Sequence, residues 1–220
     1  MKTSVIEKFN ELYSGSEMYY GWDLRKEFTD CLGKMELAGK TALDLGCGEG
    51  RYAVYLAERG CKVIAIDLAS AGIQKVKRFA EERELEIEAF VQAVDQYVFP
   101  PDHFDIIVAM TILDHLEHDA RKEVIAGIQK SLKKGGILFA YVLTVSDPGY
   151  KRKMEKIQEE EESNGVSETS FAIEYYFRSY ELAKQFPGLE ILHYNEGMEP
   201  DFSHGKPHRH GFASLIARKS

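Results

Sequence analysis

Short apolar runs alternate along the chain with longer stretches of helical spacing. The apolar runs predict five strands, at residues 41–45, 62–67, 86–94, 104–110 and 137–143. Between them, apolar positions recur every three or four residues and predict helices at about residues 51–58, 70–84 and 119–132. Gly135 and Gly136 follow the last of these helices and predict its end. Strands that alternate with helices in this way are typical of βαβ units and a mainly parallel sheet.

Both ends of the chain add elements to this pattern. Residues 1–36 contain two stretches of helical spacing joined by a loop, and they predict a helical cap. Near the other end, the pattern predicts a helix at 180–186 and strands at 189–194 and 212–217. We therefore expect an α/β fold: a doubly wound, Rossmann-like, mainly parallel sheet of seven strands, with helices on both faces and the last strand antiparallel.

Composition narrows the class of protein. The chain has 220 residues, enough for one large domain with a sizeable core. Its net charge of −8 argues against binding to nucleic acid or to an anionic membrane, because basic patches carry such affinity. Three irregularly spaced cysteines favour reduced thiols and a cytoplasmic protein over a disulfide framework. No apolar run approaches the roughly 20 residues of a membrane span, and residues 1–8 have no apolar signal region.

The most informative motif is the turn after the first predicted strand, where residues 43–50 read Leu-Asp-Leu-Gly-Cys-Gly-Glu-Gly. Glycines at alternate positions predict a sharp turn that lets a ligand approach the backbone, and the following helix offers free N–H groups. The spacing differs from the G-x-G-x-x-G of dinucleotide-binding proteins. Asp44, two residues before the first glycine, can meet a cationic group of a ligand but would repel a pyrophosphate.

Acidic residues end the next two predicted strands. Asp67 ends the second strand, Asp95 follows the third, and Met110 and Thr111 end the fourth. Ligands bind at the carboxyl ends of the strands in open α/β sheets, so these features should converge with the glycine turn on one crevice. The plain alternatives are an N-cap role for Asp67 and an ordinary loop acid at Asp95.

The pattern Asp-x-Gly-x-Gly-x-Gly resembles motif I of the class I S-adenosylmethionine-dependent methyltransferases. With the two strand-end acids and Lys-Lys-Gly-Gly at 133–136, the resemblance covers residues 37–145. It implies S-adenosylmethionine as cofactor, with Asp67 on the ribose hydroxyls, Asp95 on the adenine amine, and Asp44 facing the methionine part. The cofactor-binding residues that we predict are Asp44, Leu45, Gly46, Cys47, Gly48, Gly50, Arg51, Asp67, Leu68, Asp95, Gln96, Met110, Thr111 and Trp22.

Within this family, the chain is similar to the branch around the tellurite-resistance methyltransferases. The similar segments are residues 43–56 and 60–67 and, in the tail, 177–182, 194–196 and 212–219. This resemblance implies methyl transfer to a small soft acceptor such as a tellurite, selenite or thiol species. Because the sulfonium is already a good leaving group, we expect alignment of donor and acceptor to dominate, with no obligatory acid–base pair.

A histidine-rich segment, residues 204–210, is the first candidate for the acceptor pocket. Three readings compete: a polar hairpin turn, an anion pocket made by the cationic side chains, and a metal site with His-x-x-x-His-x-His spacing. We predict no metal. The acceptor-pocket candidates are His204, His208, Arg209, His210, His115 and Arg178.

The chain is expected to be a single domain over residues 1–220. Its parts are an N-terminal helical cap (1–36), a cofactor-binding core (37–145), an acidic insertion (146–175) and a C-terminal helix and strands (176–220). The insertion predicts a solvated helix and loop, with a lid as the alternative. The expected partner is a small-molecule substrate, without nucleic acid or membrane, for a monomer or homodimer. The alternative functions are a non-catalytic S-adenosylmethionine-binding module and a methyltransferase for another small molecule.

Overall fold

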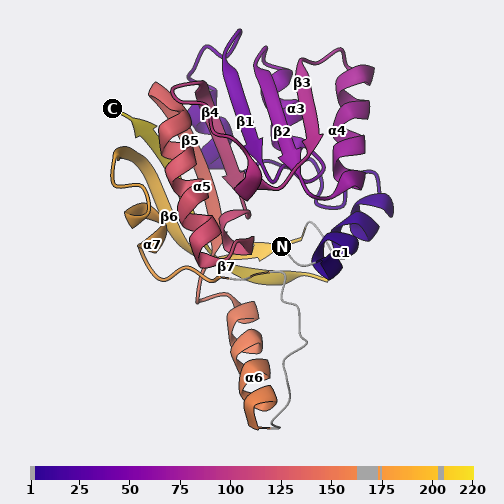
Figure 1. Ribbon diagram of the computed structural model, residues 1–220, viewed down its shortest axis with the longest axis vertical. Helices are drawn as coiled ribbons and strands as arrows, with labels where there is room; N and C mark the ends of the chain where they lie inside the picture. The colour runs from indigo at the N-terminus through magenta and orange to yellow at the C-terminus, as the bar shows by residue number, and fades with distance from the viewer. Residues whose placement is uncertain (1–2, 163–172, 174, 203–205) are drawn as a thin grey trace.

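Seven strands form one sheet in the order β3-β2-β1-β4-β5-β7-β6 in the computed structural model, which describes residues 3–162, 173, 175–202 and 206–220 (Figure 1). The strands are β1 (Thr41–Leu45), β2 (Lys62–Asp67), β3 (Ile87–Val91), β4 (Phe104–Met110), β5 (Leu132–Leu143), β6 (Leu189–Asp201) and β7 (His208–Lys219). Strands β1 to β5 are parallel, and β7 is antiparallel to both β5 and β6. The strand order reverses between β1 and β4, so the sheet is doubly wound, as predicted.

Helices cover both faces of this sheet. The helices are α1 (Thr3–Ser14), α2 (Lys26–Leu32), α3 (Arg51–Ala57), α4 (Ser70–Glu82), α5 (His118–Ser131), α6 (Pro148–Glu162) and α7 (Glu181–Lys184). Side chains of α2, α3 and α4 share one buried cluster with one face of the sheet, and side chains of α5 and α7 share another with the opposite face. Alternation along β1 separates the two clusters, because Ala42 belongs to the first, and Leu43 and Leu45 to the second.

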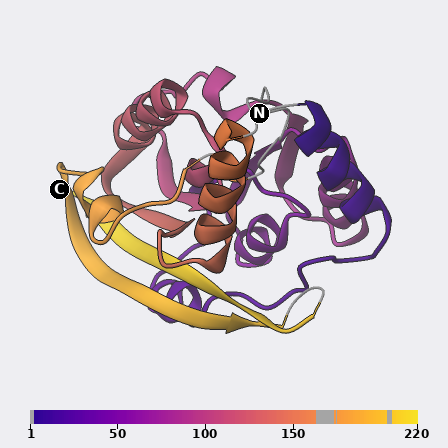
Figure 2. The same cartoon turned by 90° about the horizontal axis from the view of Figure 1, so that it is seen from below.

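Helix α1 lies beside α4 (Figure 1). The Oδ1 atom of Asn10 accepts a hydrogen bond of 2.9 Å from the backbone N–H of Ala71, which fixes α1 to the first turn of α4. Helix α6 projects from the rest of the fold (Figure 1). Strands β6 and β7 form a long curved hairpin along one side (Figure 2). Among the described residues, no helix has the length and apolar character needed to cross a membrane.

Several element boundaries differ from the predicted ones. Strand β3 stops at Val91, and a single 3-10 turn follows at Val94–Gln96. The β6–β7 hairpin is longer than predicted, since β6 continues to Asp201 and β7 begins at His208. Strand β6 is an edge strand with mostly exposed side chains, so its polar second half gives no apolar alternation from which to predict a strand.

The acidic insertion contains the predicted helix, which is α6. Residues 163–172 and 174 lie outside the described residues, so the predicted loop and lid stay predictions. Ile173 is described, and its carbonyl accepts a hydrogen bond of 2.9 Å from Nζ of Lys153 in α6.

Candidate functional site

The glycine turn lies between β1 and α3, at the carboxyl edge of the sheet. Gly46, Gly48 and Gly50 have φ angles of 66°, 54° and 86°, which are left-handed values that favour glycine. A Cβ atom on Gly50 would also lie 2.5 Å from Cγ2 of Val76 in α4. The sequence pattern therefore has a backbone cause: the turn is left-handed at each glycine and packs closely against α4.

Asp44 lies beneath this turn and is 2 % exposed. Its Oδ2 atom accepts a hydrogen bond of 3.1 Å from the backbone N–H of Ala53 in α3. Burial raises the pKa of the carboxyl to about 7, although the hydrogen bond from Ala53 opposes the shift. Asp44 also lines a pocket of about 620 Å³ at this edge of the sheet, so a cation in that pocket would favour the ionised form of Asp44.

This raised pKa predicts that S-adenosylmethionine binds more tightly as the pH rises. If the cationic methionine part selects the carboxylate, affinity should increase about tenfold between pH 6 and pH 8, because the protonated fraction falls through a pKa near 7. Calorimetric titration at the two pH values measures the change. Asp44→Asn should remove the pH dependence, and equal affinity of the native protein at pH 6 and pH 8 would contradict the assignment.

Asp67 ends β2 and turns toward the glycine turn. Its Oδ2 atom accepts a hydrogen bond of 2.9 Å from the N–H of Gly48, and its Oδ1 atom accepts one of 2.7 Å from the N–H of Ala69. Burial raises the pKa of this carboxyl, and both hydrogen bonds oppose the rise. The N-cap alternative for Asp67 is wrong, because Ala69 is the N-cap of α4 and this helix has no side-chain cap; Asp67 instead lines both pockets of the sheet edge.

Two connected pockets lie at this edge of the described structure. The larger has a volume of about 620 Å³ and includes Gly46, Gly48 and Asp67. The smaller is mainly apolar and shares Gly46, Asp67, Ile112 and His115 with the larger. Its other lining residues are Leu68, Gln92, Val94, Asp95 and Leu116.

These residues fit the predicted cofactor. The smaller pocket offers apolar walls and the Asp95 carboxylate for an adenine, with Asp67 beside it for ribose hydroxyls. The glycine turn and Asp44 line the adjoining part of the larger pocket, where a methionine part would lie. The predicted cofactor residues that line one or both pockets are Asp44, Gly46, Cys47, Gly48, Arg51, Asp67, Leu68, Asp95, Met110 and Thr111.

Four predicted cofactor residues lie elsewhere. Leu45 is buried in the α5-side core, and Gly50 packs against α4. The backbone N–H of Gln96, predicted to reach an adenine nitrogen, instead donates to the carbonyl of Ala93 at 3.1 Å within the 3-10 turn. Trp22 contacts Phe79 of α4, with ring centroids 5.0 Å apart, and is not among the pocket-lining residues.

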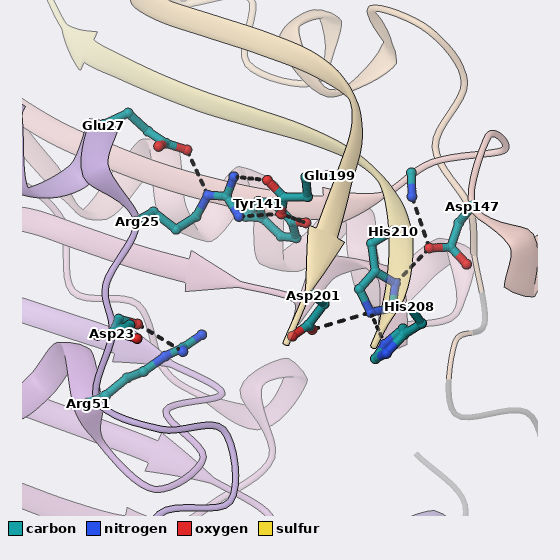
Figure 3. Close-up of polar contacts among 11 residues, drawn as sticks. Asp23, Arg25, Glu27, Arg51, Tyr141, Asp147, Glu199, Asp201, His208 and His210 are labelled. Carbon is teal, nitrogen blue, oxygen red and sulfur yellow. Dashed lines mark hydrogen bonds and ion pairs between the residues drawn. The ribbon is translucent and has the colours of Figure 1, made fainter. Parts of the chain in front are cut away.

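Arg51, a predicted cofactor residue, lines the larger pocket and also contacts the loop between α1 and α2. Its Nη1 atom donates to the backbone carbonyl of Asp23 at 3.1 Å (Figure 3). The same atom donates to the backbone carbonyl of Tyr20 at 3.3 Å. Residues 15–25, between α1 and α2, form a loop that carries Tyr19, Tyr20 and Trp22, and we call it the aromatic loop. Arg51 therefore holds the aromatic loop against the glycine turn.

Glu49, which the sequence reasoning missed, holds the same loop from within the glycine motif. Its carboxylate is 4 % exposed and accepts hydrogen bonds from the backbone N–H of Tyr19 at 2.8 Å and Tyr20 at 3.3 Å. Lys75 of α4 completes the arrangement, since its Nζ atom lies 2.7 Å from Oε1 of Glu49 and also donates to the carbonyl of Ser16. Tyr19 and Tyr20 line the larger pocket as a consequence.

The far part of the larger pocket is formed by the β6–β7 hairpin. His210 lines it together with Asp201, and Nδ1 of His210 lies 2.8 Å from Oδ2 of Asp147 (Figure 3). Asp147 is 4 % exposed, and its carboxylate also accepts hydrogen bonds from the N–H groups of Gly149 and Gly211. The hydrogen bond to Asp147 raises the pKa of His210 and is the main cause that lowers the pKa of Asp147 against its burial.

A second polar cluster lies nearby. Arg25 donates two hydrogen bonds to Glu199, of 2.6 and 2.7 Å, and a third of 2.7 Å to Glu27 (Figure 3). The hydroxyl of Tyr141 donates to Glu199 at 2.8 Å, and the Arg25 guanidinium lies 4.2 Å from the centre of the Tyr141 ring. Arg25, Tyr141 and Glu199 all line the larger pocket.

The predicted acceptor residues divide into two groups. His115 and His210 line the larger pocket, and His208 lies 2.9 Å from His210 between their Nε2 atoms. Arg209 is exposed, on the opposite side of β7, and donates to the carbonyl of Met198. Arg178 is exposed before α7 and is not among the lining residues, while His204 lies outside the described residues.

Comparison with known proteins agrees with the geometry of the glycine turn. Residues 42–136 match the family described as "Methyltransferase domain". Curated relatives include the ubiquinone biosynthesis O-methyltransferases of Methylobacterium sp. (strain 4-46), 32% identical over 111 residues, and Coxiella burnetii (strain RSA 493 / Nine Mile phase I), 33% identical over 106 residues. These matches cover 50% and 48% of this chain and 44% of each relative, so the chain spans less than half of the length of these relatives.

Solved structures with a similar fold include TehB from Haemophilus influenzae, with a TM-score of 0.71 and 20% identity over 96% of this chain and 67% of that one. A SAM-dependent methyltransferase from Methanosarcina mazei has a TM-score of 0.68 and 22% identity over 90% of this chain and 98% of that one. At these identities, the likeness concerns the fold. Residues 42–136, which form the glycine turn and the strand ends around it, are thus similar to the methyltransferase domain family, and the whole chain shares the fold of solved methyltransferases.

Proposed function

We propose that this chain is an S-adenosylmethionine-dependent methyltransferase that acts on a hydroxyl oxygen of a small aromatic acceptor. The observation that carries the proposal is one pocket of about 620 Å³ that extends from the glycine turn to an aromatic wall and a polar end. This volume lies within the roughly 300–1,000 Å³ of small-molecule sites. The names of the curated relatives, O-methyltransferases, support a hydroxyl acceptor.

The aromatic wall favours a flat acceptor. Lining residues with rings are Phe9, Tyr13, Tyr19, Tyr20, Tyr52 and Tyr141. Aromatic rings pack favourably with each other edge-to-face or offset, and their large apolar area supplies binding energy for a ring-containing ligand. Because Glu49 and Arg51 fix the loop that carries Tyr19 and Tyr20, this wall is held in place before a ligand binds.

The polar end favours a hydroxyl over an oxyanion such as tellurite or selenite. Glu199 and Asp201 bring two carboxylates to this part of the pocket. Arg25, the guanidinium that lines it there, is already paired with Glu199 and Glu27. Without a bound metal ion, an oxyanion would meet the carboxylate of Asp201 at this end, whereas a hydroxyl can donate a hydrogen bond to a carboxylate.

S-adenosylmethionine would supply a methyl group on a sulfonium; the acceptor oxygen would form the new C–O bond as the C–S bond breaks, and the hydroxyl proton would pass to the carboxylate that accepts its hydrogen bond. The protein aligns the two reactants and excludes water, and such alignment lowers the barrier by several kcal/mol. Met110 and Thr111, at the end of β4, line the pocket beside the glycine turn. Thr111 is held there by its N–H, which donates to the carbonyl of Tyr141 at 2.8 Å.

A thiol acceptor is the second candidate. The tail segment 212–219 resembles the tellurite-resistance branch, which acts on small soft acceptors, and it forms β7 beside the polar end. A neutral thiol would avoid the repulsion that an oxyanion meets from Asp201.

The direct test is formation of S-adenosylhomocysteine with a panel of acceptors: simple catechols and phenols, small thiols, tellurite and selenite. We expect turnover with a hydroxylated aromatic compound, and at least a tenfold loss of kcat/KM in Asp67→Ala. Arg209→Ala is the matched control, because this side chain is exposed and lies outside the pocket. Turnover confined to tellurite or selenite, or none with any hydroxyl compound, would overturn the proposal.

A further inference from the structure

The β6–β7 hairpin brings Asp201, His208 and His210 together at the polar end of the pocket. One ligand atom from each of the three lies within 4.8 Å of the other two. Strand pairing produces this grouping, because Asp201 pairs with His208, and His210 follows two residues later on the same face of β7. Asp201 and His210 line the larger pocket, so the group faces the site already described.

The hydrogen bonds of the two imidazoles determine where their protons lie. Nδ1 of His208 is 2.9 Å from the carbonyl oxygen of Lys206, and Nδ1 of His210 is 2.8 Å from the carboxylate of Asp147. Both partners only accept hydrogen bonds, so each Nδ1 must carry the proton. In the neutral form of each ring, the lone pair is therefore on Nε2.

These two Nε2 atoms face each other at 2.9 Å. Oδ2 of Asp201 lies 3.6 Å from Nε2 of His210, so a third electron-rich atom approaches the same point. A positive charge among two lone pairs and a carboxylate at such distances would be attracted by all three.

The surroundings favour a metal ion. In a tetrahedral zinc site with Zn–N bonds of about 2.0–2.1 Å, two imidazole nitrogens are about 3.3 Å apart, so the observed spacing needs only a few tenths of an ångström of adjustment. The carboxylate of Asp147 accepts a hydrogen bond from Nδ1, the other ring nitrogen of His210. Carboxylates commonly orient metal-bound histidines in this way. The N–H groups of Gly149 and Gly211 fix that carboxylate in turn.

We propose that Asp201, His208 and His210 bind a divalent transition metal ion of the zinc class, with Asp147 orienting His210. Two imidazoles and one carboxylate leave a coordination position open toward the pocket, as in catalytic rather than structural zinc sites. If the proposed function is right, this position would take the acceptor oxygen and favour its ionised form. That last step rests on the proposed function, whereas the metal site does not.

Zinc binding to the full-length, untagged chain, freed of metal with a chelator, tests the site without cofactor or acceptor. Calorimetry should give one zinc ion per chain, and Co²⁺ should produce the visible absorption of a four-coordinate ion. His208→Ala and Asp201→Asn should each weaken binding at least tenfold, and Asp147→Asn should weaken it by about 10–100-fold. The control is His193→Ala, an exposed histidine on the same hairpin.

The stability of each variant is measured by thermal unfolding with and without zinc. A zinc-dependent rise in Tm in the native protein that is lost in Asp147→Asn supports the site, since this variant keeps all three proposed ligands. Equal zinc affinity in the native protein and His208→Ala would overturn the proposal, as would no specific binding by the native protein. Methyl transfer without zinc binding would overturn the metal site alone, and zinc binding without methyl transfer would leave it standing.

Discussion

Glu49→Ala is expected to destabilise the protein by about 3 kcal/mol and to weaken S-adenosylmethionine binding at least tenfold. The substitution leaves Lys75 with a side chain only 12% exposed and without its carboxylate partner. Removing one member of a buried ion pair typically costs 3–5 kcal/mol, because the remaining charge stays desolvated. The N–H groups of Tyr19 and Tyr20 lose their acceptor at the same time, so the aromatic loop is no longer held against the glycine turn.

Urea denaturation measures the first effect, and calorimetric titration of the folded variant measures the second. Glu58→Ala is the matched control: it removes a glutamate paired with Arg83 at the surface, where both side chains are about 40% exposed, and should change stability by less than about 1 kcal/mol. Glu49→Ala combined with Lys75→Met should recover part of the lost stability but not the cofactor affinity. If Glu49→Ala matched Glu58→Ala in both measurements, the carboxylate would have no anchoring role.

The sequence predicted, for a local reason, that the glycine turn and the strand-end acids lie together at one edge of the sheet. The glycine turn, Asp67 and Asp95 each adjoin the carboxyl end of a strand, and the parallel sheet brings these ends to one edge. Their positions therefore followed from the strand order alone. Gln92 lines the smaller pocket and was missed because β3 ends three residues earlier than the apolar pattern indicated.

The anchoring of the aromatic loop could not be predicted in the same way. In the sequence, Glu49 stands between two glycines with no sign of a structural role. Its partners Tyr19 and Lys75 are 30 and 26 residues away, so no local pattern links them to it. The side chain of Trp22, in the same loop, points to α4 rather than to a ligand, and the sequence gives no means to separate it from Tyr19 or Tyr20. Such contacts depend on how helices pack, which no local pattern encodes.

The acceptor side depended on long-range contacts as well. The sequence predicts His210 as an acceptor-pocket residue, but its hydrogen-bond partner Asp147 lies 63 residues away. A local signal for Asp147 did exist: Asp-Pro-Gly in the connection after β5 is typical of a helix N-cap followed by proline, and α6 begins there. That signal predicts a helix start and says nothing of a histidine partner.

Gly72→Ala is expected to weaken cofactor binding at least tenfold and to destabilise the protein by about 2 kcal/mol. Gly72 lies in the first turn of α4, and a Cβ atom there would be 2.3 Å from the carbonyl oxygen of Gly48 and 3.2 Å from Cδ2 of Tyr13. The oxygen belongs to the backbone, so either the glycine turn or α4 must move. Such overpacking costs about 1–3 kcal/mol, against a gain of up to about 1 kcal/mol in helix propensity.

The displacement would be felt directly in the cofactor site, because the N–H of Gly48 donates to Asp67. Moving the turn by a few tenths of an ångström therefore disturbs both the predicted methionine-binding backbone and the carboxylate predicted for the ribose. Gly197→Ala in β6 is the matched control, since a Cβ atom there meets nothing within 4 Å. Calorimetry with S-adenosylhomocysteine measures whether Gly72→Ala weakens binding. Unchanged affinity in this variant would mean that the cofactor does not contact the backbone of this turn, and the cofactor site would have to lie elsewhere at the sheet edge.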